Sequence, residues 1–370
     1  MNISFWLPFC VLLMVISLFF SKVPSRVVFL LGAFAWSMFI SARGTFGPDT
    51  ILYSGPISFE SGLGLWIVYL SDFAQLLNIN IVILHALIYF SVASLVTLLP
   101  NKLYRSLVIG WCFYLALGGF LSDTSTIRWS FCYLTAISAF FVLVKFQFYN
   151  SKTSLVFMSL VIILIGLLGY PGSVLLFFPQ LLYEALAFIT AGKLATQARS
   201  NLFNCVLIVA SIAMITLIII LATSLIQRYF SDTVIFEEFV AFDLSLPKIS
   251  AAFFCSFLIT IYSRKLIMVT CGKQTTGGLL GDLLLGAVLF SLFLSSSSNR
   301  LSPICVSMLL IFNNLKCYSP TIVAQPNLFV LPNTYKYLLF SLVFASYMYS
   351  SNYVMQSFGF PHNIGLHLFP

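Results

Sequence analysis

Uninterrupted apolar runs, each close to 20 residues long, recur along the whole chain and constrain its fold more than any other feature. A helix of about 20 apolar residues crosses the ~30 Å hydrocarbon core of a bilayer. Lipid offers no hydrogen-bond partners, so a spanning segment must satisfy its own backbone groups, as a helix does. Only 8% of the 370 residues are charged, whereas soluble proteins carry about 25%. The sequence therefore predicts an all-α, polytopic transmembrane bundle.

The runs predict about twelve spans of this length within a single integral membrane domain, residues 1–370. Their approximate ranges are 3–20, 27–42, 80–99, 104–121, 128–147, 153–170, 172–190, 203–226, 249–268, 278–295, 301–316 and 334–354. The first run has no charged leading region and no small-residue cleavage site. We therefore interpret it as a retained helix rather than as a signal peptide.

Basic residues set the predicted sidedness, because cytoplasmic loops of membrane proteins carry an excess of Lys and Arg. The two pairs that decide it are Lys22 with Arg26, and Lys102 with Arg105. If both pairs are cytoplasmic, the chain between residues 43 and 101 crosses the membrane an odd number of times. Segment 80–99 is then a span, and the shorter segment 62–77, interrupted by Asp72 and Gln75, is interfacial or re-entrant.

Two stretches form the larger predicted extracytoplasmic loops, residues 43–79, which include the interfacial segment, and residues 227–248. Most of the 18 basic residues fall on the inner side of this topology, which accounts for the net charge of +8. No basic cluster with interleaved aromatic residues is present, so nucleic acid is not an expected partner.

Four arginines are the informative exceptions, because the topology places each at a helix end on the outer side: Arg43, Arg128, Arg228 and Arg300. A guanidinium is always charged and binds phosphate oxygens through two parallel hydrogen bonds. Together they predict a site for a pyrophosphate or another polyanion attached to a lipid. The alternative is that each snorkels to the interface or pairs with a nearby acid, as Asp123 could pair with Arg128. Asp123 is itself a candidate substrate-binding residue beside Arg128.

The first outer loop and the segment after it supply the other candidate site residues. Asp49 and Glu60 are carboxylates that could act as a general base toward a sugar hydroxyl. Tyr53 and Trp66 offer surfaces for sugar stacking or for the membrane interface. The alternative for the carboxylates is a turn or a helix cap. His85 stands alone in its span, which favours a helix–helix hydrogen bond over a ligand role.

The sequence gives no support for nucleotide or metal chemistry. Walker, HExxH and GxSxG motifs are absent, and the eight cysteines lie scattered, mostly in apolar runs, without CxxC spacing. We therefore expect neither a cofactor nor a bound metal.

These motifs resemble the EpsG-like and Wzy-type polysaccharide polymerases. The likeness lies in a loop containing Gly44-Thr45, Asp49 and Tyr53, in Phe59-Glu60 with Gly62 before an apolar helix, in Ile127-Arg128 opening a span, and in a late Asn299-Arg300-Leu301. Glu60 is followed by Ser61 where the family commonly has Pro, and a His common after the middle spans is absent.

The resemblance implies a multi-pass protein of the bacterial inner membrane that joins undecaprenyl-pyrophosphate-linked oligosaccharide repeat units into O-antigen or a related surface polysaccharide. Its partners would be that lipid-linked donor and acceptor, membrane lipid and a chain-length regulator protein. On this hypothesis Arg128 and Arg300 hold the pyrophosphate, Arg43 and Arg228 support them, and Asp49 or Glu60 orients the acceptor. The alternative is a lipid-linked oligosaccharide flippase or another polytopic transporter.

Overall fold

The computed structural model describes residues 3–20, 22–42, 65–124, 127–145 and 333–348, together with isolated positions between 246 and 307. The chain divides into two compact units, Met1–Val174 with Tyr318–Pro370, and Leu175–Cys317. All helices with described bounds belong to the first unit. The candidate site is built within this unit.

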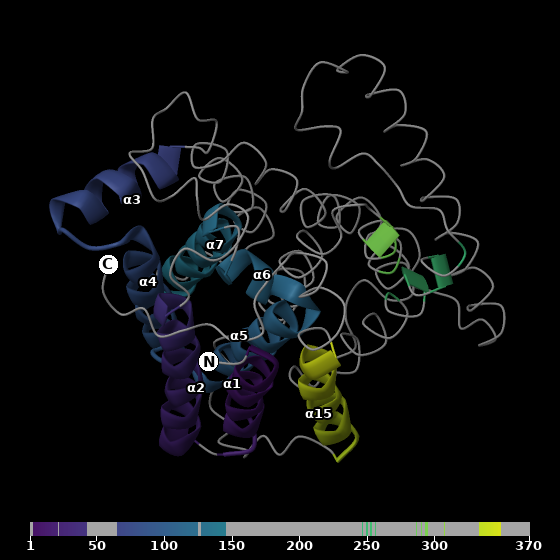
Figure 1. The fold of residues 1–370 in the computed structure, drawn as a ribbon. Coiled ribbons are helices and arrows are strands. Elements are labelled where there is room, and N and C mark those ends of the chain that lie inside the picture. The colour runs from purple at the N-terminus through teal and green to yellow at the C-terminus, as the bar shows by residue number, and fades with distance from the viewer. Residues whose placement is uncertain are drawn as a thin grey trace, which may run out of the picture. The chain divides into compact units, whose positions relative to one another are not determined.

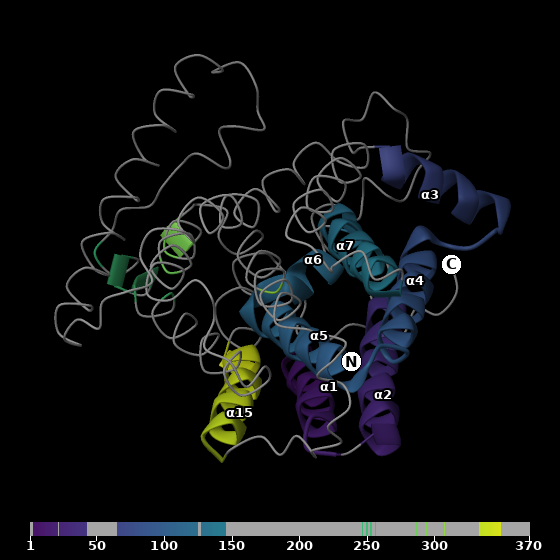
Figure 2. The same ribbon diagram turned by 180° about the vertical axis from the view of Figure 1, so that it is seen from behind.

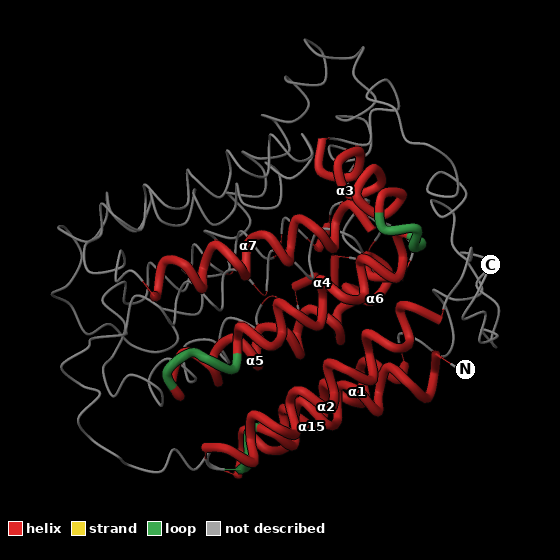
Figure 3. Tube along the Cα trace, turned by 90° about the vertical axis from the view of Figure 1, so that its left-hand side faces the viewer, coloured by secondary structure: helices red, strands yellow, loops and turns green. Residues whose placement is uncertain are grey.

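The first unit is an assembly of helices (Figure 1). Their bounds are α1 Ile3–Ser17, α2 Lys22–Ala42, α3 Leu65–Leu76, α4 Ile81–Val96, α5 Asn101–Tyr114, the π-helix η3 Leu115–Gly119, α6 Phe120–Thr124, α7 Ile127–Lys145 and α15 Asn333–Met348. The residues that the structure describes contain no strand (Figure 3), which agrees with the predicted all-α class.

Two stretches among the described residues are long and apolar enough to cross a membrane, Lys22–Ala42 and Leu103–Thr124. A third follows if Trp66–Leu76 and Ile81–Val96, which are bent by 107° to one another, form one crossing. The length and apolar composition of these helices are compatible with an all-α membrane protein. Six of the predicted spans overlap described helices in residue range. The predicted spans between residues 153 and 226 and the loop 43–64 lie outside the described residues, as do all but isolated positions of the loop 227–248 and of the predicted spans between residues 249 and 316.

The helix α1 packs against α2 and α15, and α2 packs against α4, which in turn contacts α7. Close approach of α1 and α2 depends on Gly32, because a Cβ there would lie 3.1 Å from the Cys10 carbonyl oxygen and from the Leu13 Cβ. Small residues allow helices to approach in this way in membranes, where no hydrophobic driving force brings them together. The path through α5, η3 and α6 contacts α1, α7 and α15 and can be followed in Figure 2.

One end of this unit gathers basic residues from the beginnings of two helices, α2 and α5, that are distant in sequence. Arg26 donates to the Leu99 carbonyl oxygen at 3.0 Å and to Asn101 Oδ1 at 3.3 Å. Arg105 donates to the Phe20 carbonyl oxygen at 2.9 Å. The turn between α1 and α2 therefore lies beside the turn between α4 and α5, and we refer to this side of the unit as the basic end.

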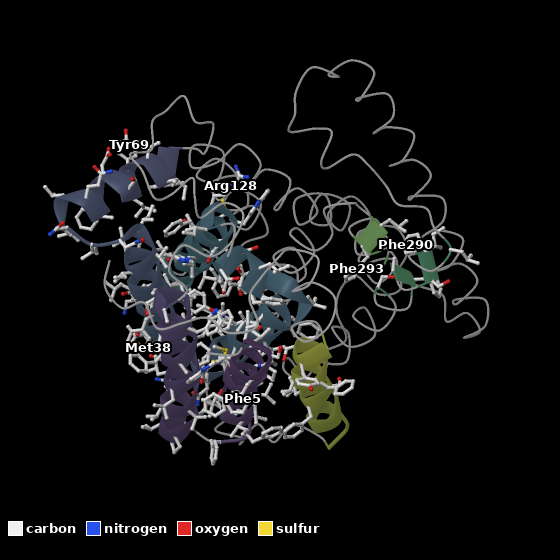
Figure 4. The ribbon with its side chains drawn as sticks, viewed as in Figure 1. Phe5, Met38, Tyr69, Arg128, Phe290 and Phe293 are labelled. Carbon is white, nitrogen blue, oxygen red and sulfur yellow. The ribbon has the colours of Figure 1, made fainter. Side chains whose placement is uncertain are left out.

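Isolated described residues of the second unit form a small apolar cluster. Ala252, Phe290 and Leu294 are buried, with Ile249 and Phe293 packed against them; Figure 4 labels Phe290 and Phe293. The Phe253 and Phe290 rings meet edge to face at 6.4 Å. Residues of the predicted spans 249–268 and 278–295 thus pack together.

Candidate functional site

A completely buried carboxylate, Asp123, lies at the centre of a hydrogen-bond network between helices. Its Oδ2 accepts a hydrogen bond from Trp36 Nε1 at 2.8 Å. Its Oδ1 accepts hydrogen bonds from the Tyr114 hydroxyl at 2.7 Å and from Ser130 Oγ at 2.6 Å. These donors come from α2, from the end of α5 and from α7, so one side chain joins three separate segments. A buried carboxylate is tolerated in an apolar interior only with partners of this kind.

A break in the helix between Tyr114 and Asp123 makes this network geometrically feasible. In a continuous α-helix, residues nine apart lie about 13.5 Å apart along the axis and on opposite faces. The 2.7 Å hydrogen bond between these two side chains therefore requires the chain to change direction. It does so in η3, where Gly118 adopts φ 110°, ψ 5°, a backbone conformation that suits glycine.

The next residue, Gly119, makes room for the Tyr114 side chain. A Cβ at this position would lie 2.5 Å from Tyr114 Cδ2 and Cε2 and 2.5 Å from the Tyr114 carbonyl oxygen. The Tyr114 ring also stacks on Tyr133 of α7, with centroids 3.9 Å apart and planes inclined by 8°. The tyrosine that donates to Asp123 is thus stacked on Tyr133 and lies close against the backbone of Gly119.

A fourth helix joins the network through His85 of α4, which is also fully buried. His85 Nε2 lies 2.8 Å from Ser130 Oγ. Since the single hydroxyl proton of Ser130 is donated to Asp123, Nε2 must act as the donor to Ser130. The prediction that His85 makes a helix–helix hydrogen bond is confirmed.

The network lies at the end of the unit opposite to the basic end. Trp36 is six residues from the last residue of α2, His85 four from the first residue of α4, and Ser130 three from the first residue of α7. At a rise of about 1.5 Å per residue, each therefore lies within about 9 Å of the helix end. This depth would place the network inside the apolar region, close to one face.

Arg128 is the second residue of α7 and the only one of its first four residues that is not buried. Its neighbours Ile127, Trp129 and Ser130 are 0–1% exposed. The first turn of α7 is consequently fixed in the protein interior, and the arginine side chain is its one part-exposed member. Figure 4 labels Arg128 at this end of the unit.

The helix α3, which contacts α4 and α7, also lies at this end. Its exposed positions include Trp66, Tyr69 and Phe73, whereas Ile67 and Val68 are buried. Tyr69 and Arg128 are both labelled in Figure 4. Trp66, a predicted binding residue, is 41% exposed on the first turn of this helix.

Three of the nine predicted site residues can be placed: Arg128, Asp123 and Trp66. Asp49, Glu60, Arg43, Tyr53, Arg228 and Arg300 lie outside the described residues, so their roles stay predictions. Trp36, Tyr114 and Ser130 belong to the network but are not among the residues predicted from the sequence. The Gly118-Gly119 pair within an apolar run was the one available signal of a helix break there.

Comparison with protein-family models, with curated proteins and with solved structures found no match for this chain. The described residues themselves define a class: an all-helical protein with two or three apolar helices of membrane-spanning length and a buried, carboxylate-centred network near one end.

Proposed function

We propose that the protein is a polymerase of lipid-linked oligosaccharide repeat units, acting at the periplasmic face of the bacterial inner membrane. In this proposal the chain crosses the membrane about twelve times, and α3 is the interfacial helix of the first periplasmic loop. The reaction transfers a growing glycan from undecaprenyl pyrophosphate to a sugar hydroxyl of the next lipid-linked unit. The anomeric carbon–oxygen bond to pyrophosphate breaks, and the acceptor oxygen forms the new bond and loses its proton.

The observation that carries the proposal is the placement of Arg128. It is a part-exposed cation on a rigid, otherwise buried helix turn, at the opposite end of the unit from Arg26 and Arg105. Basic residues at one end fit a cytoplasmic face, but this rule does not account for an arginine at the opposite end. Phosphate binding through the planar guanidinium group would account for it.

The reaction requires little further catalysis by the protein, because pyrophosphate is already a good leaving group. The enzyme must hold two lipid-linked sugars in line and stabilise the negative charge that develops as the pyrophosphate departs. We assign this stabilisation to Arg128 and Arg300, with Arg43 and Arg228 in support. Asp49 or Glu60 would orient the acceptor hydroxyl and receive its proton.

The exposed aromatic side chains of α3 support an interfacial position for this helix. Trp and Tyr concentrate at the level of the lipid headgroups, because their rings are apolar and each carries one polar group. Trp66 and Tyr69 lie on one exposed face with Phe73, and the helix is bent by 107° relative to α4. A lipid-linked substrate would meet this face on its way to Arg128.

Complementation of a gene deletion tests the proposal. In a bacterial host that makes a surface glycan with this protein, deletion should leave lipopolysaccharide with a single repeat unit in place of the long-chain ladder on a gel. The wild-type gene should restore the ladder, and Arg128→Ala at equal expression should not. Lys145→Ala is the matched control, since Lys145 is an exposed basic residue at the far end of the same helix.

The outcomes separate the proposal from its alternatives. An unchanged ladder after deletion would exclude a polymerase. A full ladder in both Arg128→Ala and Arg300→Ala would show that the assigned arginines are wrong.

A lipid-linked oligosaccharide flippase is the second candidate. The observation in its favour is the buried acid and histidine joined through Ser130, since ionisable residues within membranes often mark transport pathways. A flippase predicts loss of the entire glycan after deletion, including the first repeat unit.

A further inference from the structure

The network around Asp123 restrains the helix that carries Arg128. We infer that the Asp123 carboxylate is a positioning group, which fixes the rotation of α7 and thereby the direction of the Arg128 side chain. The inference rests on the proposed function only for the identity of what Arg128 binds. The restraint itself follows from the contacts of the described residues.

Asp123 is buried, so its carboxylate contacts other protein side chains rather than a substrate. The residue is 0% exposed, and its two oxygens accept hydrogen bonds from Trp36, Tyr114 and Ser130. Two of these donors, Trp36 and Tyr114, belong to segments other than α7. Asp123 is thus tied to the body of the unit, and Ser130 is tied to Asp123.

Rotation of α7 would break this connection. Successive residues of a helix are turned by about 100° around its axis, so a shift of one residue would carry Ser130 well beyond hydrogen-bond distance of Asp123. The same rotation would turn Arg128 by an equal angle, because it lies only two positions earlier in the helix. The rotation that brings Ser130 Oγ within 2.6 Å of Asp123 therefore also sets the direction of Arg128.

His85 supplies a second restraint on the same serine. It reaches Ser130 Oγ from α4 at 2.8 Å, while Asp123 reaches it from the end of α6 at 2.6 Å. Because the Ser130 hydroxyl is hydrogen-bonded to both α4 and α6, α7 is restrained relative to each of these helices.

Site-specific labelling measures the position of residue 128 without requiring activity. The Arg128→Cys variant in native membranes is treated with a small water-soluble thiol reagent, and the modified peptide is quantified by mass spectrometry, so that native cysteines do not interfere. The rate is compared with that of Arg128→Cys combined with Asp123→Asn or with Ser130→Ala. Ser138→Ala is the matched control, because Ser138 Oγ donates only within α7, to the Leu134 carbonyl oxygen at 2.9 Å.

We expect Asp123→Asn and Ser130→Ala each to change the labelling rate at position 128 by about tenfold, the effect of losing one buried hydrogen bond. Ser130→Thr, which keeps the hydroxyl, should return the rate toward the reference. Ser138→Ala should leave it unchanged. Reference rates in both Asp123→Asn and Ser130→Ala would overturn the inference.

A second reporter separates rotation from general loosening. A rotation exposes a different face of α7, whereas opening of the helix exposes all of its faces. Ala136 and Ile137 are 1% and 0% exposed and lie about 100° apart around the helix axis, so rotation should not make both the Ala136→Cys and the Ile137→Cys variants reactive. Labelling of both in the Ser130→Ala background would show that the whole helix has opened, which also overturns the inference. Should Asp123→Asn fail to accumulate, Ser130→Ala decides alone, because it leaves Asp123 with two donors.

The glycan gel distinguishes this inference from the proposed function. Altered labelling at position 128 together with an unchanged ladder after gene deletion would refute the polymerase proposal and leave the positioning role intact. Unaltered labelling together with a lost ladder in Arg128→Ala would do the reverse.

Discussion

The Gly119→Ala substitution tests the requirement for the helix break most directly. The added methyl carbon would lie 2.5 Å from two ring carbons of Tyr114 and 2.5 Å from its carbonyl oxygen. The ring cannot turn aside freely, because it stacks on Tyr133 and donates to Asp123. The carbonyl oxygen cannot move without the backbone. Relief of the clash therefore requires a shift of η3 itself.

Two contributions set the expected magnitude. Overpacking a well-filled interior costs about 1–3 kcal/mol, and losing the partner of a buried polar group costs a further ~1–3 kcal/mol. The free energy of unfolding should fall by roughly 2–6 kcal/mol. At about 2 °C per kcal/mol, the value for larger chains, the apparent melting temperature should drop by about 4–12 °C.

The assay is the fraction of monodisperse protein that survives heating in detergent, measured by size-exclusion chromatography at a fixed heating time, because unfolding of such proteins is commonly irreversible. Ser138→Ala is the control, since it removes one hydrogen bond within a helix and leaves the network untouched. A Gly119→Ala midpoint equal to that of the wild type would refute the reasoning, because the described geometry has no room for the methyl group.

Two further predictions concern stability and use the same assay. Asp123→Ala should lower the midpoint by more than Ser130→Ala does. It leaves three buried donors without an acceptor at about 1–3 kcal/mol each, whereas Ser130→Ala leaves one, His85 Nε2, in that state. Equal midpoints would contradict a network centred on the carboxylate. Gly32→Leu should separate α1 from α2 and cost about 1–3 kcal/mol, because even a Cβ there would lie 3.1 Å from the Cys10 carbonyl oxygen; the neighbouring control Leu31→Val, at a side chain 54% exposed, should change little.

Helical class and helix positions could be predicted from the sequence, because both follow from runs of apolar residues. The predicted spans 27–42 and 80–99 correspond to α2 and α4, with ends displaced by up to five residues. The helix α2 begins earlier than predicted, at Lys22, because lysine and arginine can extend from a helix end to water while their stems stay apolar. The apolar pattern gives no information about where such a helix starts.

The network could not be predicted in the same way. Asp123 and Ser130 are close in sequence, but Trp36 and His85 reach them from helices 87 and 45 residues away. Tyr114 could not be predicted as a member either, since the apolar run over 104–121 predicts one continuous helix. A helix of that kind would have placed Tyr114 on the face opposite to Asp123.

The break and the network depend on each other, which explains why they occur together. A non-helical turn within an apolar region leaves backbone groups without their regular partners, and membranes tolerate this only where protein surrounds the turn. Here Leu115, Gly118 and Gly119 are all buried. The break in turn brings Tyr114 to Asp123, and that hydrogen bond helps to stabilise a carboxylate whose burial in an apolar interior would otherwise be costly. Substituting Gly118 or Gly119 should therefore weaken the hold of Asp123 on α7 as well as destabilise the fold. The direction of the Arg128 side chain thus depends on the helix break and on the network around Asp123.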